Sequence, residues 1–409
     1  MSSSQRPVVI LGSTGSIGTQ CIRVIERNPN LYRVTALAAG GHNLALLARQ
    51  CVRLGVEIVA IADGDKAELE AELRQAFQTE GLPVRRLQIL VGERAATECA
   101  ASSSADTVVV NGITGAIGLD PSLAALRAGA TLALANKESL VAGAPLIRSA
   151  LQRPGQIVPV DSEHSAIAQC LRSGRHERGL TVPVVSGKTD VSSLVLTASG
   201  GPFRGKTRAE LETVTVAQAL NHPTWDMGPV VTINSATLMN KALELIEAHV
   251  LFDIAPEHII PVVHPQSHIH SMVQWKDGST IAQTSPPSML IPIALGLSWP
   301  DRLEAVAPAN LFDFPFSWDF EPVDLQTFPA LQLARECAAA GGTMPAVMNA
   351  ANEVCVQAFR DERIGFLDIV ARVQEVCSEH ETLPGTSHEE VSTAVTWAQS
   401  YARHLIATR

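Results

Sequence analysis

Three polar residues in a mostly apolar stretch of the chain are spaced to do chemistry. Thr237, Lys241 and Glu244 follow one another at i, i+4 and i+7, with Asn240 beside them. A lysine and a glutamate on the inward face of a buried helix must meet a ligand, a metal ion or each other. A phosphate is one candidate, because a helix N-terminus with serine, asparagine and lysine nearby suits an anion. A lysine–glutamate pair on a solvated edge is the alternative.

The segment that positions these residues, 222–250, divides into a loop and a helix. Its first part contains three helix breakers, Pro223, Gly228 and Pro229. The helix is expected to begin after Asn234 or Ser235, either of which can cap it. Trp225 and Met227 lie between the helix breakers, so this segment, about residues 219–230, is expected to be a flap that closes over a ligand.

Two further carboxylates stand close together at the end of a predicted strand. Asp161 and Glu163 precede a helix predicted over residues 165–171. Paired carboxylates with hydroxyl groups nearby suit a hard divalent cation such as Mg²⁺ or Mn²⁺. A helix cap with acids favoured by the dipole is the alternative. Farther on, His268 and His270 alternate onto one face, where a metal pair, a strand edge or a subunit contact would explain them.

A glycine turn near the N-terminus predicts a dinucleotide site. Gly12-Ser-Thr-Gly15-Ser-Ile-Gly18 follows an apolar run at 7–11 and precedes an amphipathic segment at 19–27. Glycine lets the backbone approach a pyrophosphate, and the helix N-terminus donates amides to it. A tight strand-to-helix turn without a ligand is the alternative reading.

The end of the next predicted strand, 33–38, favours NADP over NAD. Gly40, Gly41, His42 and Asn43 follow it, with no carboxylate to hold a ribose 2′-hydroxyl or to repel a 2′-phosphate. His42 and Asn43 are weak candidate partners of that phosphate, and surface turn residues are the alternative.

Other apolar runs predict more strands of the same sheet, at 56–61, 107–110 and 131–134. A second glycine turn, 111–118, follows one of them, and Asn136, Lys137 and Glu138 follow another. Two glycine turns at the carboxyl edge of an open α/β sheet would line a ligand crevice. The three polar residues either reach cofactor and substrate there or begin a surface helix.

Composition limits the classes of function. With 409 residues and 46% hydrophobic content the chain can form two or three domains. Its net charge of −10 and its 4% aromatic content disfavour nucleic-acid and acidic-membrane partners. The seven scattered cysteines form no C-x-x-C motif, which indicates reduced thiols and a cytoplasmic protein. We see no signal peptide and no apolar run long enough to span a membrane.

The chain is expected to be an α/β protein of several parts. Residues 1–160 should form a Rossmann-like doubly wound parallel sheet that binds the dinucleotide, and residues 161–299 an α/β catalytic domain with the flap. Residues 300–329, rich in Pro, Asp and Phe, read as a linker. Residues 330–409 should form a helical bundle, with Ala-rich amphipathic helices at 330–340, 345–359, 365–377 and 389–406.

Seven motifs occurring in order resemble those of the 1-deoxy-D-xylulose 5-phosphate reductoisomerase family. They are GSTGSIG at 12–18, LANKES at 134–139, PVDSEHSA at 159–166, TASGGPFR at 197–204, HPTWDMG at 222–228, NSATLMNKALELIE at 234–247 and HPQSHIHSM at 264–272. Together they span almost the whole chain and are far more specific than any one of them. The resemblance implies an enzyme that uses NADPH and a divalent metal, forms homodimers and commits carbon to isoprenoids.

The resemblance also implies a role for each matching residue. NADPH would be held by Thr14, Gly15, Ser16, Ile17, Gly40, Gly41, His42, Asn43, Asn136, Glu138 and Gly228. The metal (Mn²⁺, Mg²⁺ or Co²⁺) would be held by Asp161, Glu163 and Glu244. The substrate phosphate would be held by Ser199, Ser235, Asn240 and Lys241, and His222, also a substrate-binding residue, would close with the flap. Lys137, Ser162 and Glu163 would contact the oxygenated carbons, and Trp225 and Met227 would cover the substrate.

The chemistry that the resemblance implies requires these groups together. The family's favoured route cleaves a carbon–carbon bond by a retro-aldol step, rejoins the pieces as a branched aldehyde and reduces that aldehyde with NADPH. The metal would act as Lewis acid and template, with Lys137 as an electrostatic helper. Lys137, Glu163 and His222 are therefore the candidate catalytic residues, and the substrate is a phosphorylated sugar.

Three positions depart from the usual family pattern. Gly41-His42 stands where many relatives have Lys or Arg, His268 where an aliphatic residue is usual, and Ser288 where Asp is frequent. None of them belongs to the metal set. Two other functions compete: a semialdehyde dehydrogenase-like enzyme, which would need a nucleophilic cysteine such as Cys170, and an NADP-sensing regulator, which would predict a degraded metal set.

Overall fold

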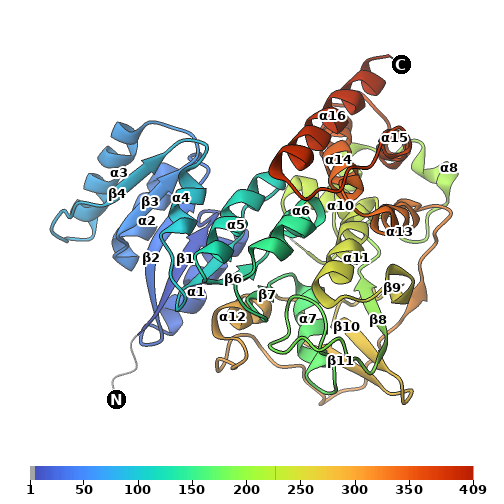
Figure 1. The fold of residues 1–409 in the computed structure, drawn as a ribbon, viewed down its shortest axis with the longest axis horizontal. Coiled ribbons are helices and arrows are strands. Elements are labelled where there is room, and N and C mark those ends of the chain that lie inside the picture. The colour runs from blue at the N-terminus through green and yellow to red at the C-terminus, as the bar shows by residue number, and fades with distance from the viewer. Residues whose placement is uncertain (1–4, 226, 409) are drawn as a thin grey trace. The chain divides into compact units, whose positions relative to one another are not determined.

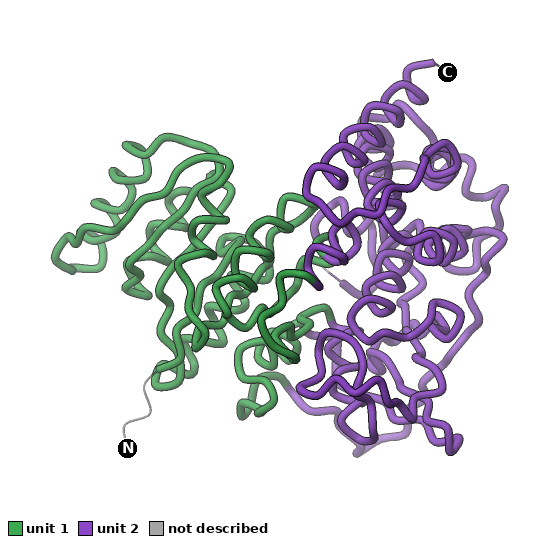
Figure 2. Tube along the Cα trace, in the orientation of Figure 1, with its two compact units in different colours: residues 1–139, 149–161, 289–307 green, residues 140–148, 162–288, 308–409 purple. Residues whose placement is uncertain are grey.

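The structure is a computed structural model that describes residues 5–225 and 227–408 (Figure 1). Two compact units make up the chain (Figure 2). Unit 1 comprises residues 1–139, 149–161 and 289–307, and unit 2 comprises residues 140–148, 162–288 and 308–409. The four-part division expected from the sequence, with boundaries at residues 160, 299 and 329, stays a prediction.

Unit 1 is built on a seven-stranded parallel sheet with the order β4-β3-β2-β1-β5-β6-β7. The central strands are short apolar runs because both of their faces are buried. The strands are β1 (Arg6–Leu11), β2 (Tyr32–Ala39), β3 (Ile58–Ile61), β4 (Gln88–Val91), β5 (Val108–Asn111), β6 (Thr131–Leu134) and β7 (Ile157–Pro159).

Helices cover both faces of this sheet, which confirms the doubly wound arrangement. One face packs on α1 (Ser16–Arg27), α2 (Leu44–Leu54), α3 (Lys66–Thr79) and α12 (Leu290–Ser298). The other packs on α4 (Ala95–Ala101) and α5 (Leu119–Arg127), and η1 (Ala116–Gly118) precedes α5. In the sheet, β1 lies between β2 and β5, so the strand order reverses beside β1. Open α/β sheets bind their ligands at such a point.

A mixed five-stranded sheet in unit 2 has the order β11-β10-β8-β9-β12, with only β8 and β9 parallel. Its strands are β8 (Val191–Ala198), β9 (Ile259–Val263), β10 (Ile269–Trp275), β11 (Thr280–Thr284) and β12 (Glu321–Pro322). β10 and β11 form a hairpin that turns at residues 276–278.

The remaining helices of unit 2 include the four predicted near the C-terminus. Those four are α13 (Ala330–Ala340), α14 (Met344–Arg360), α15 (Phe366–Ser378) and α16 (His388–Ala407). The others are α7 (Ser162–Leu171), α8 (Arg208–Leu211), α9 (Val216–Ala219), α10 (Pro229–Ala236), α11 (Met239–Phe252) and η2 (Pro256–His258). One further helix, α6 (Lys137–Ala150), has residues in both units and a non-helical Gly143.

The segment from residue 229 to residue 252 corrects the sequence prediction. A helix, α10, already begins at Pro229, because proline at the first helical position has a favourable φ and no hydrogen bond to lose. It ends at Ala236, and Leu238, with φ +58°, separates it from α11. The expected single helix beginning after Asn234 or Ser235 is therefore wrong, and Thr237 does not share a helix with Lys241.

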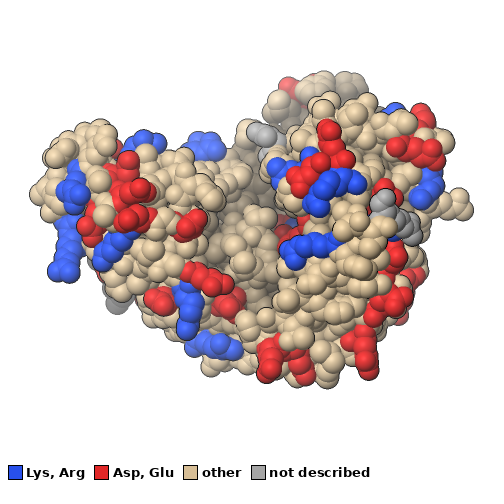
Figure 3. Space-filling model, turned by 90° about the horizontal axis from the view of Figure 1, so that it is seen from above, with Lys and Arg blue, Asp and Glu red and all other residues tan. Residues whose placement is uncertain are grey.

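The surface of the molecule carries charges of both signs. On the face shown in Figure 3, Lys and Arg side chains are intermixed with Asp and Glu side chains, in a chain of net charge −10. Among the residues that the structure describes, no helix has both the length and the apolar character needed to cross a bilayer.

Candidate active site

Three carboxylates from separate parts of the sequence gather at the start of α7. Asp161 is one peptide bond from Ser162, the first residue of α7, and Glu163 lies in the first turn of that helix. Glu244 comes from α11. One carboxylate oxygen of Asp161, of Glu163 and of Glu244 lies within 4.8 Å of the others. Such an oxygen-only set suits Mg²⁺, Mn²⁺ or another hard divalent cation.

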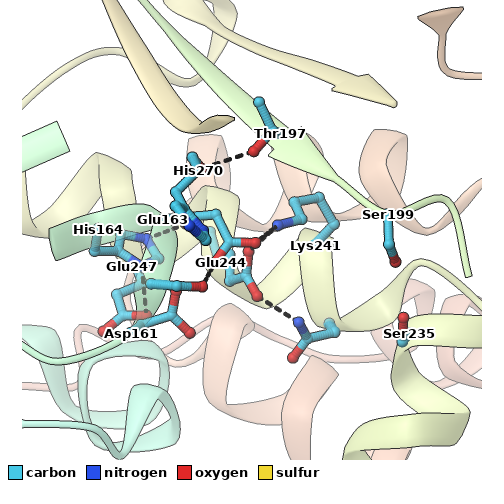
Figure 4. A network of polar contacts seen from close by, with 12 residues as sticks. Asp161, Glu163, His164, Thr197, Ser199, Ser235, Lys241, Glu244, Glu247 and His270 are labelled. Atoms are coloured by element: carbon cyan, nitrogen blue, oxygen red, sulfur yellow. Dashed lines mark hydrogen bonds and ion pairs between the residues drawn. The ribbon is translucent and has the colours of Figure 1, made fainter. Parts of the chain in front are cut away.

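Two ammonium groups already balance these carboxylates. In unit 1, Lys137 Nζ lies 2.8 Å from Asp161 Oδ2. In unit 2, Lys241 Nζ lies 2.5 Å from Glu163 Oε1 and also forms an ion pair with Glu244 (Figure 4). The side chain of Lys241 thus holds a positive charge where a metal ion would satisfy the same oxygens, so the donor set fits a cation.

Burial makes the Lys241–Glu244 pair strongly interdependent. Lys241 is 4% exposed and Glu244 is 1% exposed. Burial lowers the pKa of Lys241, but the carboxylates of Glu163 and Glu244 raise the pKa by more, so Lys241 stays charged. The buried carboxylate of Glu244 is therefore balanced by a positively charged group.

Asn240 and Lys241, both expected at a phosphate, are directed at carboxylates in this structure. The Asn240 side-chain amide donates to Glu244 Oε1, and the Ser162 hydroxyl donates to Glu163 Oε2. The structure thus brings Asn240, Lys241 and Ser162 to the carboxylate cluster.

Ser199 and Ser235, the other two residues expected at a phosphate, both contact His222, which was expected to close with the flap. His222 Nε2 lies 3.1 Å from the hydroxyl oxygen of Ser199 and 3.1 Å from that of Ser235. The turn after Ser199 fits closely against the second serine, because a Cβ on Gly201 would lie 2.7 Å from the carbonyl oxygen of Ser235. Ser199, His222 and Ser235, which we call the hydroxyl–imidazole cup, form a compact group of donors for an anion.

The hydrogen bonds of His222 settle which of its ring nitrogens carries the proton. The backbone N–H groups of Thr224 and Trp225 donate to Nδ1 at 3.1 and 2.9 Å. Because Nδ1 accepts, the neutral ring carries its hydrogen on Nε2, which faces the two serine hydroxyls. Burial also lowers the pKa of His222, which favours the neutral ring. The cup therefore offers neutral donors.

Sequence reasoning missed a buried histidine–glutamate pair beside the carboxylate cluster. His164 Nδ1 lies 3.3 Å from Glu247 Oε2, and both side chains are at most 1% exposed. His164 Nε2 donates to the backbone carbonyl of Glu244 at 2.9 Å. Asp161, His164 and Glu247 form a second group that could hold a metal. The available signal was a second carboxylate one turn after Glu244 in an apolar helix.

The first glycine turn of unit 1 has the close backbone approach expected of a pyrophosphate cradle. Gly12 has φ +82°, and a Cβ there would lie 2.9 Å from the carbonyl oxygen of Gly112 in the second glycine turn. A Cβ on Gly18 would lie 2.3 Å from the oxygen of Gly12. The two glycine turns are therefore in contact beside β1, while Gly15 and Ser16 are exposed.

Asn136 uses its side chain within the protein. Its amide nitrogen donates to the carbonyl oxygens of Ile113 and Gly115 at 2.6 and 2.9 Å, and its oxygen caps α6. It thereby fixes the second glycine turn. It also donates to Glu138, and burial raises the pKa of Glu138. His42 and Asn43 lie exposed after β2, and Asn43 caps α2.

Several other candidates have ordinary structural roles. His270 Nε2 contacts Ser285, whereas His268 Nδ1 contacts Asn310, so they have separate partners. Cys170 is buried with its pKa raised to about 12, which does not suit a nucleophile. Of the flap residues, Trp225 and Met227 are half-buried and Gly228 is exposed, and Asp226 lies outside the described residues.

Comparison with known proteins places this site in a family. Residues 8–144 match the family model of 1-deoxy-D-xylulose 5-phosphate reductoisomerase, and 157–252 and 284–401 match two C-terminal domains of that enzyme. The reductoisomerase of Beutenbergia cavernae is 55% identical over 406 residues, which cover 99% of this chain and 98% of the relative. The chain belongs to the 1-deoxy-D-xylulose 5-phosphate reductoisomerase family. A second reductoisomerase, from Streptomyces coelicolor, is 53% identical over 405 residues, 98% of this chain and 93% of the relative.

Solved reductoisomerase structures share the fold. The enzyme from Zymomonas mobilis in complex with NADPH is 40% identical, with a TM-score of 0.85 over 98% of this chain and 99% of that one. A reductoisomerase in complex with NADPH, fosmidomycin and magnesium is 33% identical, with a TM-score of 0.85 over 98% of each chain. The family and the α/β fold expected from the motifs are therefore confirmed.

Proposed function

We propose that this chain converts 1-deoxy-D-xylulose 5-phosphate to 2-C-methyl-D-erythritol 4-phosphate, as an NADP-dependent oxidoreductase that requires a divalent metal. The product serves the non-mevalonate synthesis of isoprenoid precursors. The observation that carries the proposal is the gathering of Asp161, Glu163 and Glu244 next to a buried lysine in a member of the reductoisomerase family. An NADP-sensing regulator would have no use for that cluster, and Cys170 does not suit a semialdehyde dehydrogenase.

Asp161, Glu163 and Glu244 would hold the metal ion, and their carboxylate oxygens suit Mn²⁺, Mg²⁺ or Co²⁺. When bound, such an ion supplies Lewis acidity to a ketone oxygen and its neighbouring hydroxyl. Lys137, Ser162 and Glu163 would orient the oxygenated carbons of the substrate. The ion pair of Lys137 with Asp161 keeps an ammonium group near the first ligand, where it can stabilise negative charge on oxygen.

Ser199, His222 and Ser235 would bind the substrate phosphate, together with Asn240 and Lys241. The contacts within the cup support this role, because each of the three side chains can turn a hydrogen toward an anion. Binding energy at the phosphate lies away from the reacting carbons and helps hold them in place. Trp225 and Met227, in the segment that follows His222, would cover the substrate and exclude water.

NADPH would bind at the glycine turns of unit 1 and supply hydride. Thr14, Gly15, Ser16 and Ile17 would contact its pyrophosphate at the N-terminus of α1. The turn of Gly40, Gly41, His42 and Asn43 would receive the 2′-phosphate end, and Asn136, Glu138 and Gly228 would complete the site. The contact of Gly12 with Gly112 supports this placement, since it leaves backbone rather than side chains at the crevice.

The enzyme is further proposed to be a cytoplasmic homodimer. All seven cysteines are free and buried, as suits a reducing compartment. Residues 311–320 of unit 2, here called the aromatic strap, expose Leu311, Phe312, Phe314, Phe316 and Phe320. The ring centroid of Phe316 lies 5.6 Å from that of Phe312 and 6.3 Å from that of Phe314, so these three exposed rings form one surface. An apolar surface of this kind suits a second copy of the chain.

The proposal is tested by following NADPH oxidation with 1-deoxy-D-xylulose 5-phosphate and Mn²⁺, with and without EDTA. Oxidation should require the metal and should be largely lost in Asp161→Asn. Folded enzyme that binds NADPH but shows no turnover with this substrate would contradict the proposed function.

A further inference from the structure

Lys241 and Asn240 stand at the junction of two chemical groups in unit 2. On one side the Lys241 ammonium contacts Glu163 and Glu244, and Asn240 also donates to Glu244. On the other side are the hydroxyls of Ser199 and Ser235, as Figure 4 shows. The two residues expected to bind phosphate thus direct their donors toward the carboxylates in this structure.

Both the carboxylates of Glu163 and Glu244 and a phosphate bound in the cup would need the positive charge of Lys241. Glu163 and Glu244 carry negative charge, and Glu244 is 1% exposed, so removing its cation would leave a buried charge at high cost. Ser199, His222 and Ser235 supply only neutral donors, because Nδ1 of His222 accepts two backbone hydrogen bonds. A phosphate dianion in that cup gains most from an added positive charge.

A single ammonium group cannot serve both groups at once. Lys241 Nζ is within 2.5 Å of Glu163 Oε1, at the position a metal ion would need in order to reach the same oxygens. A lysine side chain has a flexible four-carbon stem and a compact charge, so rotation about that stem would move the ammonium while the backbone of α11 stays in place.

We propose that Lys241 exchanges between the two groups, serving as the cation of the carboxylates until a divalent metal displaces it toward the phosphate cup. This inference rests on the proposed function and adds an order of events to it. Metal binding makes the lysine available to the phosphate, and the phosphate in turn removes the competitor of the metal. The two ligands must then strengthen each other by the same factor.

The exchange is tested by isothermal titration of metal-free enzyme with Mn²⁺ and with methyl phosphate, each alone and each in the presence of the other. Methyl phosphate carries the phosphate ester but none of the oxygens that would chelate the metal. We expect each ligand to raise the affinity for the other by about tenfold or more.

Lys241→Met removes the ammonium and keeps the aliphatic stem. In this variant Mn²⁺ should bind more tightly than in the wild type, since no ammonium has to leave, and the coupling should fall to less than about twofold. Lys206→Met is the matched control, because it removes one positive charge from an exposed position in the same unit. The control should keep the coupling of the wild type.

Loss of a buried cation will destabilise Lys241→Met without metal, so thermal unfolding provides a second readout. Mn²⁺ should raise its Tm by more than it raises that of the wild type, because binding only to the folded state stabilises it in proportion to affinity. Lys241→Gln, which can bridge the carboxylates without charge, should show the same loss of coupling. Weaker Mn²⁺ binding in both variants, or wild-type coupling in either, would overturn the proposal.

Turnover measured on the same preparations separates this inference from the proposed function. Active wild-type enzyme whose coupling survives in Lys241→Met would leave the function intact and remove the exchange. If the coupling depends on Lys241 but the wild-type enzyme shows no turnover, the exchange stands and the proposed function is wrong.

Discussion

Glu244 is the residue on which the metal, the lysine and the amide of Asn240 converge. Glu244→Gln keeps the shape of the side chain but removes the charge that a hard cation requires. We expect Mn²⁺ affinity to fall by more than about 100-fold, since even residues that only support a ligand cost 10–100-fold. Calorimetric titration measures it, with the exposed Glu257→Gln as control. Unchanged Mn²⁺ binding in Glu244→Gln would remove this residue from the metal site.

His270 is expected to make stability depend on pH. Burial lowers its pKa to about 4, against about 6.5 in an unfolded chain. Its folded state therefore favours the neutral ring, and its contribution is fully present above pH 6.5 and is lost as pH falls toward 4. When the pH is lowered from 7 to 5, the free energy of unfolding of the wild type should fall by about 2 kcal/mol more than that of His270→Gln. Urea denaturation of the metal-free enzyme measures this difference.

The control for that measurement is the exposed His404→Gln, which should follow the wild type. Equal pH dependence in wild type and His270→Gln would show that another group carries the effect, such as His176 or His264, whose pKa values burial also lowers.

For single residues, the sequence allowed us to predict which side chains take part in the chemistry, but not which partners those side chains contact. Asp161, Glu163 and Glu244 were identifiable because charged residues stand out in apolar or strand-end settings. The partners of Asn240 and Lys241 were not, since an ammonium or an amide can bind either a carboxylate or a phosphate and only three-dimensional placement selects one. Glu247 was overlooked because its partner, His164, lies far away in the sequence.

Among the elements, the turn from β1 to α1 depends on glycine at one position in particular. Gly12→Ala would place a Cβ 2.9 Å from the oxygen of Gly112 at a φ of +82°. The turn must shift, so we expect NADPH affinity to fall by about tenfold, a change of about 1.4 kcal/mol. Fluorescence titration with NADPH measures it.

Gly64→Ala is the matched control for this turn. Gly64 also has a positive φ, +112°, but the nearest atom to its added Cβ would be 3.6 Å away. It should strain the backbone without changing NADPH affinity. Normal NADPH binding by Gly12→Ala would mean that the cradle does not need this close approach.

Element prediction succeeded where periodicity is strong and failed where local rules conflict. The four C-terminal helices and the central strands of the parallel sheet follow from their apolar patterns. The edge strand β4 did not, because its apolar run, residues 89–91, is only three residues long. α10 was missed because Pro229 was treated as a helix breaker, although proline is favoured at the first position of a helix.

At the scale of the whole molecule, the aromatic strap predicts association. Phe312 and Phe314 are 71% and 58% exposed, which a surface in water does not favour. Sedimentation equilibrium should give the wild type twice the 43.5 kDa mass of the chain. Phe312→Ser combined with Phe314→Ser should shift it toward monomer, whereas the paired Val184→Ser and Val185→Ser substitutions, at two other exposed apolar residues of the same unit, should not. A double Phe variant that stays dimeric would place the interface elsewhere.

The most direct test of the central claim is the proton NMR spectrum of the product formed from 1-deoxy-D-xylulose 5-phosphate, NADPH and Mn²⁺. Rearrangement followed by reduction places the methyl group on a carbon without hydrogen, so its signal is a singlet. Simple reduction of the ketone would place that methyl beside a C–H and give a doublet. We predict the singlet, with one NADPH consumed per substrate. A doublet would show that the enzyme is a reductase without isomerase activity and would rule out the proposed reaction.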